Sequence, residues 1–386
     1  MRRTHFLLGG SAVAVASTST IAGAQILGGF RKQYTIAVSV PLSGDAMRSG
    51  EQIADGVRAA INEANNLSGP LGTAFGLRTF DDQNALATAF TNAEFAADDP
   101  SIVATIGEFD STVTLGSLPQ YANKQMPLIV PTGTLDEITQ RGYRNVFRLP
   151  VKDSTEGRFF AQYLARERHP TLAMAVAQDG DYGAGVAQGF VDGAKVEKMT
   201  ADGYVFPYVK PDFAAAAKAI VAKSPDFIYL CGKTGDMGPL VATLRAGGYA
   251  GSFGASEGFY NLATMQQYGA LLEGALFSSS LPPLDRAPSI FTELADLRGR
   301  LGQVSGLSAF GYAAAQIVMQ AARRTGATNR LAMLSTLRNG GSYATLVGNY
   351  SFDANGDPID PNVYFYTIAG GKFKFLKPSK PNGFIL

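Results

Sequence analysis

Short β-type runs alternate with helical patterns along this chain, and the alternation occurs in two consecutive series. In the first series, Tyr34 to Val40 is typical of a strand, and residues 51–65 carry apolar side chains at helical spacing. The pattern predicts further strands and helices of this series at 76–80, 85–97, 102–106, 113–123 and 127–130. Strands that alternate with helices indicate a parallel sheet covered by helices on both faces.

The second series begins after Pro150. It predicts helices at 155–167, 183–196, 213–222 and 237–246, and strands at 172–177, 204–208, 227–231 and 252–255. Residues 278–283 are typical of a crossover, and they precede expected helices at 290–302, 308–326 and 331–338 and strands at 349–352 and 363–368. Two similar α/β lobes with several crossings between them indicate a hinged clamshell, with ligand bound at the carboxyl ends of the strands.

The first residues have the three-part layout of a secretory signal. Arg2 and Arg3 precede an uncharged, Ala-rich stretch, which ends in the small-residue pattern Ala22-Gly23-Ala24. The paired arginines suit the twin-arginine route. We therefore expect a signal peptide at 1–24 and a periplasmic mature protein. The alternative is an uncleaved membrane anchor, although the apolar stretch is short for the about 20 residues that span a bilayer.

Composition excludes several classes of function. The formal net charge is +1, so no general attraction to nucleic acid or acidic lipid is expected. Cys231 is the single cysteine, which excludes an internal disulfide, and its apolar neighbours indicate a core thiol. The two histidines are His5, in the signal, and His169, before a proline. With no Ser-His-Asp set, metal-ligand cluster or P-loop visible, we expect no enzymatic activity, no cofactor and no metal.

Oxygen-bearing side chains alternate between Asp353 and Asp357, as they do in calcium-binding loops. The same stretch contains Asn355-Gly356, which is a strong turn signal. Because no acidic residue follows at the spacing that completes a calcium loop, we expect a turn.

Hydroxyl side chains follow two strands of the first series. Ser111 opens the helix after the strand at 102–106, and Thr132, Gly133 and Thr134 follow the strand at 127–130. A helix N-terminus offers free N–H groups and the positive end of a dipole, so two such loops side by side suit a carboxylate. The alternative is ordinary helix capping, for which serine and threonine are common.

Several segments resemble the leucine/isoleucine/valine-binding family of periplasmic binding proteins. They occur in the family's order over nearly the whole expected mature chain, and their motifs are strong only together. The segments are Pro41-Leu42-Ser43-Gly44, Phe80-Asp81-Asp82-Gln83, Pro131-Thr132-Gly133-Thr134 with the following 135–143, Asp181-Tyr182-Gly183-Ala184-Gly185, and Gly254-Ala255-Ser256-Glu257-Gly258.

The resemblance implies a type I periplasmic-binding-protein fold of class α/β, two doubly wound lobes joined by a hinge that the chain crosses several times. We expect one lobe at 34–150 plus 281–350 and the other at 151–280 plus 351–386. It also implies that the protein is the binding component of an ABC importer, with an inner-membrane permease as partner and no nucleic acid. We expect a monomer.

The resemblance also assigns roles to individual residues. Ser111, Thr132 and Thr134 would bind the carboxylate of an amino acid, with Gly133 between them. Tyr182 would close over the ligand, and Glu257 would bind its ammonium group, because a buried carboxylate needs a cationic partner. The alternative for Glu257 is a surface loop acid.

The sequence departs from the branched-chain binders of the family where they carry aromatic residues around the ligand. Ser49 and Thr234 stand in these places, next to Arg48 and Lys233. We expect Ser49 and Thr234 to line the site and Lys233 to lie at its solvated rim. Phe109, Phe259 and Tyr260 are either replacement walls or core residues. The ligand is therefore expected to be a branched-chain or related amino acid, with an aromatic or other small carboxylate, an amide or urea as alternative.

Overall fold

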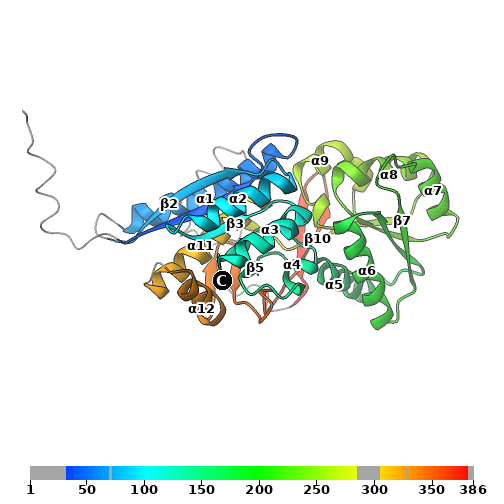
Figure 1. Cartoon of the computed structure of the whole chain (residues 1–386). Coiled ribbons are helices and arrows are strands. Elements are labelled where there is room, and N and C mark those ends of the chain that lie inside the picture. Colours follow the sequence, from blue (N-terminus) through cyan, green and yellow to red (C-terminus); the bar gives the residue numbers. More distant parts are fainter. Residues whose placement is uncertain (1–31, 69–71, 285–304, 327–328, 381–386) are drawn as a thin grey trace, which may run out of the picture.

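A computed structural model describes residues 32–68, 72–284, 305–326 and 329–380. The expected signal at 1–24 and the expected helix at 290–302 lie outside these ranges. The described chain forms two α/β lobes side by side, each built around its own sheet (Figure 1). Within the described ranges, no helix is long and apolar enough to cross a membrane.

The first lobe contains a five-stranded parallel sheet. Its order is β2-β1-β3-β4-β5. The parallel sheet and four of its strands confirm the prediction from the first series, whereas the strand Val146–Arg148 was not predicted. The strands are β1 (Gln33–Val40), β2 (Ala74–Asp81), β3 (Ile102–Gly107), β4 (Leu128–Val130) and β5 (Val146–Arg148). Because the order reverses beside β1, the loops after β1 and β3 lie at a topological switch point, where ligands bind in open α/β sheets.

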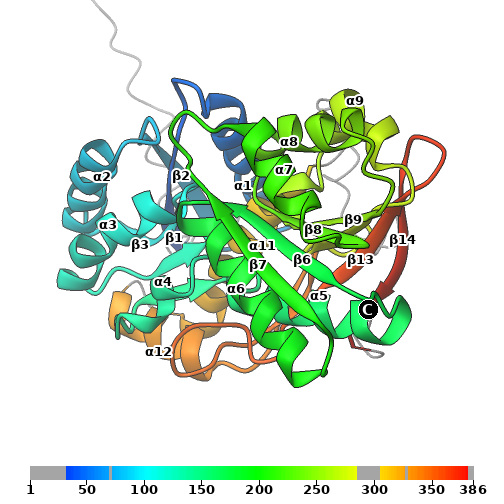
Figure 2. The same cartoon turned by 90° about the vertical axis from the view of Figure 1, so that its right-hand side faces the viewer.

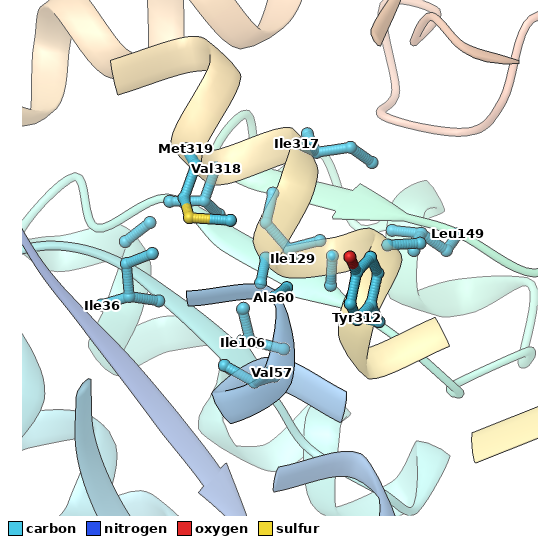
Figure 3. Close-up of a cluster of buried hydrophobic side chains, with 14 of the residues drawn as sticks. Ile36, Val57, Ala60, Ile106, Ile129, Leu149, Tyr312, Ile317, Val318 and Met319 are labelled. Carbon is cyan, nitrogen blue, oxygen red and sulfur yellow. The ribbon is translucent and has the colours of Figure 1, made fainter. Parts of the chain in front are cut away.

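Alternate side chains of the sheet enter two different cores. Ile36 and Val38 of β1 pack with α1 (Met47–Ser68) and α11 (Gly306–Thr325), as Figure 3 shows for Ile36, Val57 and the α11 residues. Ala37 points to the other face, which α2 (Leu86–Asp98) and α3 (Ser111–Asn123) cover. The helix that the sequence predicts at 308–326 is therefore part of the first lobe.

The second lobe contains a seven-stranded sheet in the order β14-β13-β10-β9-β8-β6-β7 (Figure 2). Four strands of its parallel part were predicted, namely β6 (Ala173–Gln178), β7 (Ala201–Phe206), β8 (Phe227–Cys231) and β9 (Ser252–Ala255). The fifth, β10 (Leu276–Ser279), was not predicted, and it runs into the stretch 278–283 that was expected to be a crossover. The antiparallel strands β13 (Tyr364–Ile368) and β14 (Phe373–Pro378) complete the sheet. Cys231 is fully buried in this sheet.

Four helices cover the two faces of this sheet. Met174 and Val176 pack with α7 (Phe213–Val221) and α8 (Thr234–Ala246), whereas Ala173 and Ala175 pack with α5 (Asp153–Glu167) and α6 (Asp181–Val196). Successive side chains of β6 therefore point alternately into the apolar cores on the two faces of the sheet. The remaining short elements are α4 (Glu137–Gln140), η1 (Glu257–Phe259), α9 (Leu262–Tyr268), η2 (Gly269–Leu272), α12 (Arg330–Asn339), β11 (Tyr343–Thr345) and β12 (Gly348–Tyr350).

The segment after β12 stays with the first lobe. Phe352 lies in its core with its ring 5.1 Å from that of Phe147, and Gly356 accepts a hydrogen bond from the backbone of Arg148. The expected boundary after residue 350 is therefore several residues too early, because Phe352 finds its apolar partners beside β5.

The segment 353–357 forms the expected turn. Asp353 Oδ1 accepts hydrogen bonds from the backbone N–H groups of Asn355, Gly356 and Asp357. Gly356 has φ +95°, and a Cβ atom there would lie 2.0 Å from the carbonyl oxygen of Val146. Only glycine fits this turn against β5.

Replacing Gly356 by alanine should therefore destabilise the fold by about 1–3 kcal/mol, because the backbone would be strained and would have to withdraw from Val146. Gly76→Ala, on the edge strand β2 with no atom closer than 3.7 Å to the new Cβ, serves as control. Urea unfolding followed by circular dichroism measures both. Equal midpoints for the two variants would contradict the prediction.

Candidate functional site

The carboxyl ends of the two sheets face each other at the junction of the lobes. Lys233, which precedes α8 in the second lobe, has its Nζ 3.5 Å from Oδ2 of Asp110, which caps α3 in the first. Tyr260 packs against the apolar cores of both lobes. The loops after β3, β4, β8 and β9 therefore come together here, and they carry most of the predicted site residues.

In the first lobe, the structure joins the loops after β3 and β4. The Ser111 hydroxyl accepts hydrogen bonds from the backbone N–H groups of Thr134, at 3.1 Å, and Leu135, at 3.4 Å. The Thr132 hydroxyl donates to the carbonyl of Phe109 at 2.8 Å. Ser111, Thr132 and Thr134 are thus neighbours, as predicted, and Asp110 rather than Ser111 caps the helix.

Arg148 stabilises the loop after β4. Its guanidinium is completely buried and donates to the carbonyl oxygens of Thr134 and Leu135, each at 2.7 Å. It also donates to the Thr139 hydroxyl and pairs with Asp357 at 2.8 Å. The backbone of Thr134 is therefore fixed by a buried ion pair that itself depends on the turn at 353–357.

In the second lobe, Glu257 begins η1 directly after β9, and its side chain is half-buried. Its two carboxylate oxygens accept hydrogen bonds from the hydroxyls of Ser279, at 3.0 Å, and Ser280, at 2.9 Å. Removal from solvent raises the pKa of Glu257, and these hydrogen bonds oppose the rise. Among the residues that the structure describes, no lysine or arginine forms an ion pair with Glu257.

Tyr182, in the first turn of α6, reaches the same loop. Its hydroxyl accepts a hydrogen bond from the backbone N–H of Gly258 at 3.0 Å. The structure therefore brings Tyr182 and Glu257 together, although 75 positions separate them in the numbering.

Four other residues considered for the site lie in a core or at the edge of the junction, namely Thr234, Ser49, Gly133 and Phe259. The Thr234 hydroxyl is buried and bonds to the Gly258 carbonyl and to Thr264. Ser49 lies partly exposed at the start of α1. A Cβ on Gly133 would meet Ile138 at 2.8 Å, so its close neighbours are core side chains. Phe259 is a core residue of the second lobe, whereas Phe109 and Tyr260 are only partly buried.

Two acids of α5 that the sequence did not single out lie behind Glu257 and Thr134. Glu156 Oε1 accepts hydrogen bonds from the Glu257 N–H and the Ser278 hydroxyl, both at 2.7 Å, and its Oε2 lies 3.3 Å from the Tyr182 hydroxyl. Burial and the nearby Glu257 carboxylate raise the pKa of Glu156 to about 8. In the sequence it is an ordinary acid near a helix start, so only the tertiary contacts identify it.

Asp153 is the second of these acids, and it is fully buried. Neither of its carboxylate oxygens has a hydrogen bond of normal geometry. Burial raises the pKa of Asp153 to about 8, although the Thr134 hydroxyl lies near enough to oppose the rise. Within the described ranges, no group of three acidic, histidine or cysteine side chains has the geometry of a metal site, so these acids do not form one.

Lys233 lies at the exposed rim with about half of its side chain in solvent. Exposed ion pairs contribute at most about 1 kcal/mol, so Lys233→Ala should weaken ligand binding by no more than about fivefold. The effect should shrink at high salt, because the pair with Asp110 is screened. Calorimetric titration at low and high salt measures this, with Lys223→Ala, an exposed pair elsewhere in the second lobe, as control. A much larger loss would indicate that Lys233 contacts the ligand.

In this structure two lobes meet at a polar junction, which is the architecture of a solute-binding protein. Comparison with known proteins agrees with it. The family model for periplasmic binding proteins matches residues 33–372. The chain belongs to this family.

Similar sequences and structures include several amino-acid binders. The Leu/Ile/Val-binding protein of Citrobacter freundii is 27% identical over 85% of this chain and 89% of its own. The Leu/Ile/Val-binding protein homolog 1 of Brucella melitensis biotype 1 is 25% identical over 98% of this chain and 100% of its own. The leucine-binding protein LivK of Thermotoga maritima superposes with a TM-score of 0.80 at 23% identity, covering 91% of this chain and all of its own.

A second kind of neighbour shares the fold. A solute-binding protein of R. palustris in complex with benzoate superposes with a TM-score of 0.77 at 18% identity, covering 90% of this chain and 97% of its own. The expected type I fold is therefore confirmed, and neighbours with this fold include a complex with isoleucine as well as the complex with benzoate.

Proposed function

We propose that this protein captures an amino acid, branched-chain or related, outside the cytoplasm and presents it to the permease of an ABC importer. The observation that carries the proposal is the pairing of two kinds of group across the lobe junction. Hydroxyl and N–H groups follow β3 and β4 in the first lobe. Glu257 follows β9 in the second, and no lysine or arginine of the described residues pairs with it. Together they suit a small zwitterion.

The carboxylate of the ligand would lie against Ser111, Thr132, Gly133 and Thr134. The Ser111 hydroxyl can donate its proton to a carboxylate while it accepts from the Thr134 N–H. The start of α3 adds the positive end of a helix dipole. Arg148 keeps Thr134 in place without contributing its own charge directly, because its donors are already occupied by protein oxygens.

The ammonium group would lie against Glu257, with Tyr182 closing over the ligand and Ser49 and Thr234 near the side chain. The partners of the half-buried Glu257 carboxylate among the described residues are uncharged, so it gains most from a cation. The relatives named for leucine, isoleucine and valine support this assignment. Binding would draw the lobes together and stabilise the form that the permease recognises.

The export signal at 1–24, the twin-arginine route, the periplasmic location and the monomeric state are parts of the same proposal, as is the absence of enzymatic activity. The family to which the chain belongs supports a binding role.

Calorimetric titration of residues 25–386 with leucine, isoleucine, valine, benzoate and 4-hydroxybenzoate tests the proposal. We expect micromolar or tighter binding of at least one amino acid and none of the aromatic acids. The benzoate-bound neighbour makes an aromatic carboxylate the second candidate, and preferential binding of benzoate would replace the first proposal with the second.

A further inference from the structure

The contacts of Glu156 join four separate pieces of the site. Its carboxyl group lies at the start of α5 and touches the backbone of η1, a hydroxyl of β10 and a hydroxyl of α6. The partners Glu257, Ser278 and Tyr182 lie 101, 122 and 26 positions away in the chain. One buried side chain therefore sets the relative placement of the two second-lobe residues proposed to contact the ligand.

We infer that Glu156 is a positioning residue for the ammonium site and that it performs this task as a neutral carboxylic acid. This inference rests on the proposed function in one respect only, namely that Glu257 and Tyr182 contact the ligand. Glu156 itself is 1% exposed and would not touch the ligand.

The neutral form of Glu156 can keep all of its hydrogen-bond partners. Its Oε1 accepts from the Glu257 N–H and the Ser278 hydroxyl, which a carbonyl oxygen with two lone pairs can do. The Tyr182 hydroxyl lies 3.3 Å from Oε2 and has the geometry of a donor to it. Because a hydroxyl hydrogen can rotate, a protonated Oε2 can donate to the Tyr182 oxygen instead, and the Tyr182 hydroxyl then keeps its own proton for the ligand.

The charges around Glu156 also favour the neutral form. Burial and the Glu257 carboxylate are the two largest causes that raise the pKa of Glu156, to about 8. No described lysine or arginine forms an ion pair with it. The titratable groups that face it are Asp153 on its own helix, Glu257 on η1, Tyr182 on α6, and Tyr229 and Cys231 on β8.

The consequence is that the pair of carboxyl groups, Glu156 and Glu257, carries one negative charge at neutral pH. That charge belongs to Glu257, whose oxygens have two hydroxyl donors. A single ammonium group neutralises it, so the site suits an amino acid with one cationic group near the lobe junction.

The first test compares Glu156→Gln with Glu156→Ala. Glutamine keeps the acceptor and replaces the acid O–H with an N–H donor, so its affinity for leucine should stay within about threefold of the unmodified protein at pH 7. Alanine leaves the Glu257 N–H without its acceptor, and affinity should fall by roughly tenfold or more. Glu167→Gln, an exposed acid on the same helix, is the matched control and should bind normally. Equal binding by the alanine variant, or loss of binding by the glutamine variant, would overturn the inference.

The second test needs no ligand. The ordinary pKa of the side chain is 4.5 and its folded value is about 8, so the unfolded chain binds fewer protons at Glu156 between these values. This group therefore lowers stability progressively as pH rises from 4.5 to 8. Glu156→Gln lacks this contribution, so the urea midpoint of the variant should rise relative to the unmodified protein across that range and stay constantly higher above it. Parallel curves would show that Glu156 is ionised throughout.

Infrared spectra separate the two proposals completely. At pH 7 the unmodified protein should show the C=O band of a protonated carboxyl group that Glu156→Gln lacks. If this band is present but no amino acid binds, the proposed function fails while the neutral state of Glu156 stands. If amino acids bind and the band is absent, the inference about Glu156 fails alone.

Discussion

Replacing Glu257 by glutamine is expected to abolish most amino-acid binding while it leaves the fold intact. The substitution removes the negative charge but keeps the shape. The amide oxygen still accepts from one of the two hydroxyls of Ser279 and Ser280, and the other hydroxyl can turn to accept from the amide NH2. Loss of one partner from a desolvated charge pair costs about 2–4 kcal/mol, which is roughly a 30- to 700-fold loss of affinity. Calorimetric titration with the amino acid that binds best measures this.

The control for Glu257→Gln is Glu137→Gln, which removes an exposed acid from the first lobe. Its affinity should equal that of the unmodified protein. If Glu257→Gln also binds normally, the ammonium group must lie elsewhere. The fully buried Asp153, whose oxygens have no hydrogen bond of normal geometry, then becomes the next residue to test. A ligand without an ammonium group should be insensitive to the change.

The second large effect is expected from Arg148→Met. This change leaves Asp357 with only the more distant Lys152, at 3.9 Å, as a cation, and it leaves the Thr134 and Leu135 carbonyls without the Arg148 donors. Removing one member of a buried ion pair destabilises proteins by about 3–5 kcal/mol. The midpoint of urea unfolding should fall accordingly, and binding should weaken because the Thr134 loop loses its support.

Arg141→Met provides the comparison for Arg148→Met, because Arg141 forms an exposed ion pair with Glu137. Such pairs contribute at most about 1 kcal/mol, so its unfolding midpoint should hardly move. The double variant Arg148→Met, Asp357→Leu should recover part of the lost stability, since no uncompensated charge remains. Equal midpoints for Arg148→Met and Arg141→Met would show that the buried pair does not hold the first lobe together.

Much of the fold was predictable because the hydrophobic periodicity is regular. Strands such as Phe227–Cys231 are uninterrupted apolar runs, as expected for strands buried on both faces, and they matched. The edge strand β14 was not predicted, because its residues alternate with lysines and lie largely exposed. The lobe boundary near 350 was misplaced because Phe352 packs against Phe147, a contact that no local pattern encodes.

In the candidate site, the sequence could predict which residues lie together only where they follow strands directly. Ser111 and Thr134 end up 3.1 Å apart because their strands β3 and β4 are neighbours in a parallel sheet. The network behind Glu257 could not be predicted in the same way. The role of Glu156 follows from hydrogen bonds to partners more than 100 positions away in the chain. Its neighbouring residues in the sequence differ little from those of any acid in a first helical turn.

The packing of α11 against α1 bears on the order in which the molecule can be assembled. The first lobe draws its core from residues near both ends of the chain, because α11 and Phe352 bury the face of the sheet that α1 covers. A nascent chain that ends before residue 305 already contains strands β6 to β10 of the second lobe, yet it lacks half of the first core. The first lobe therefore completes its core only after most of the second lobe has been synthesised. In a truncated chain, the apolar face of α1 would stay exposed to solvent and to chaperones.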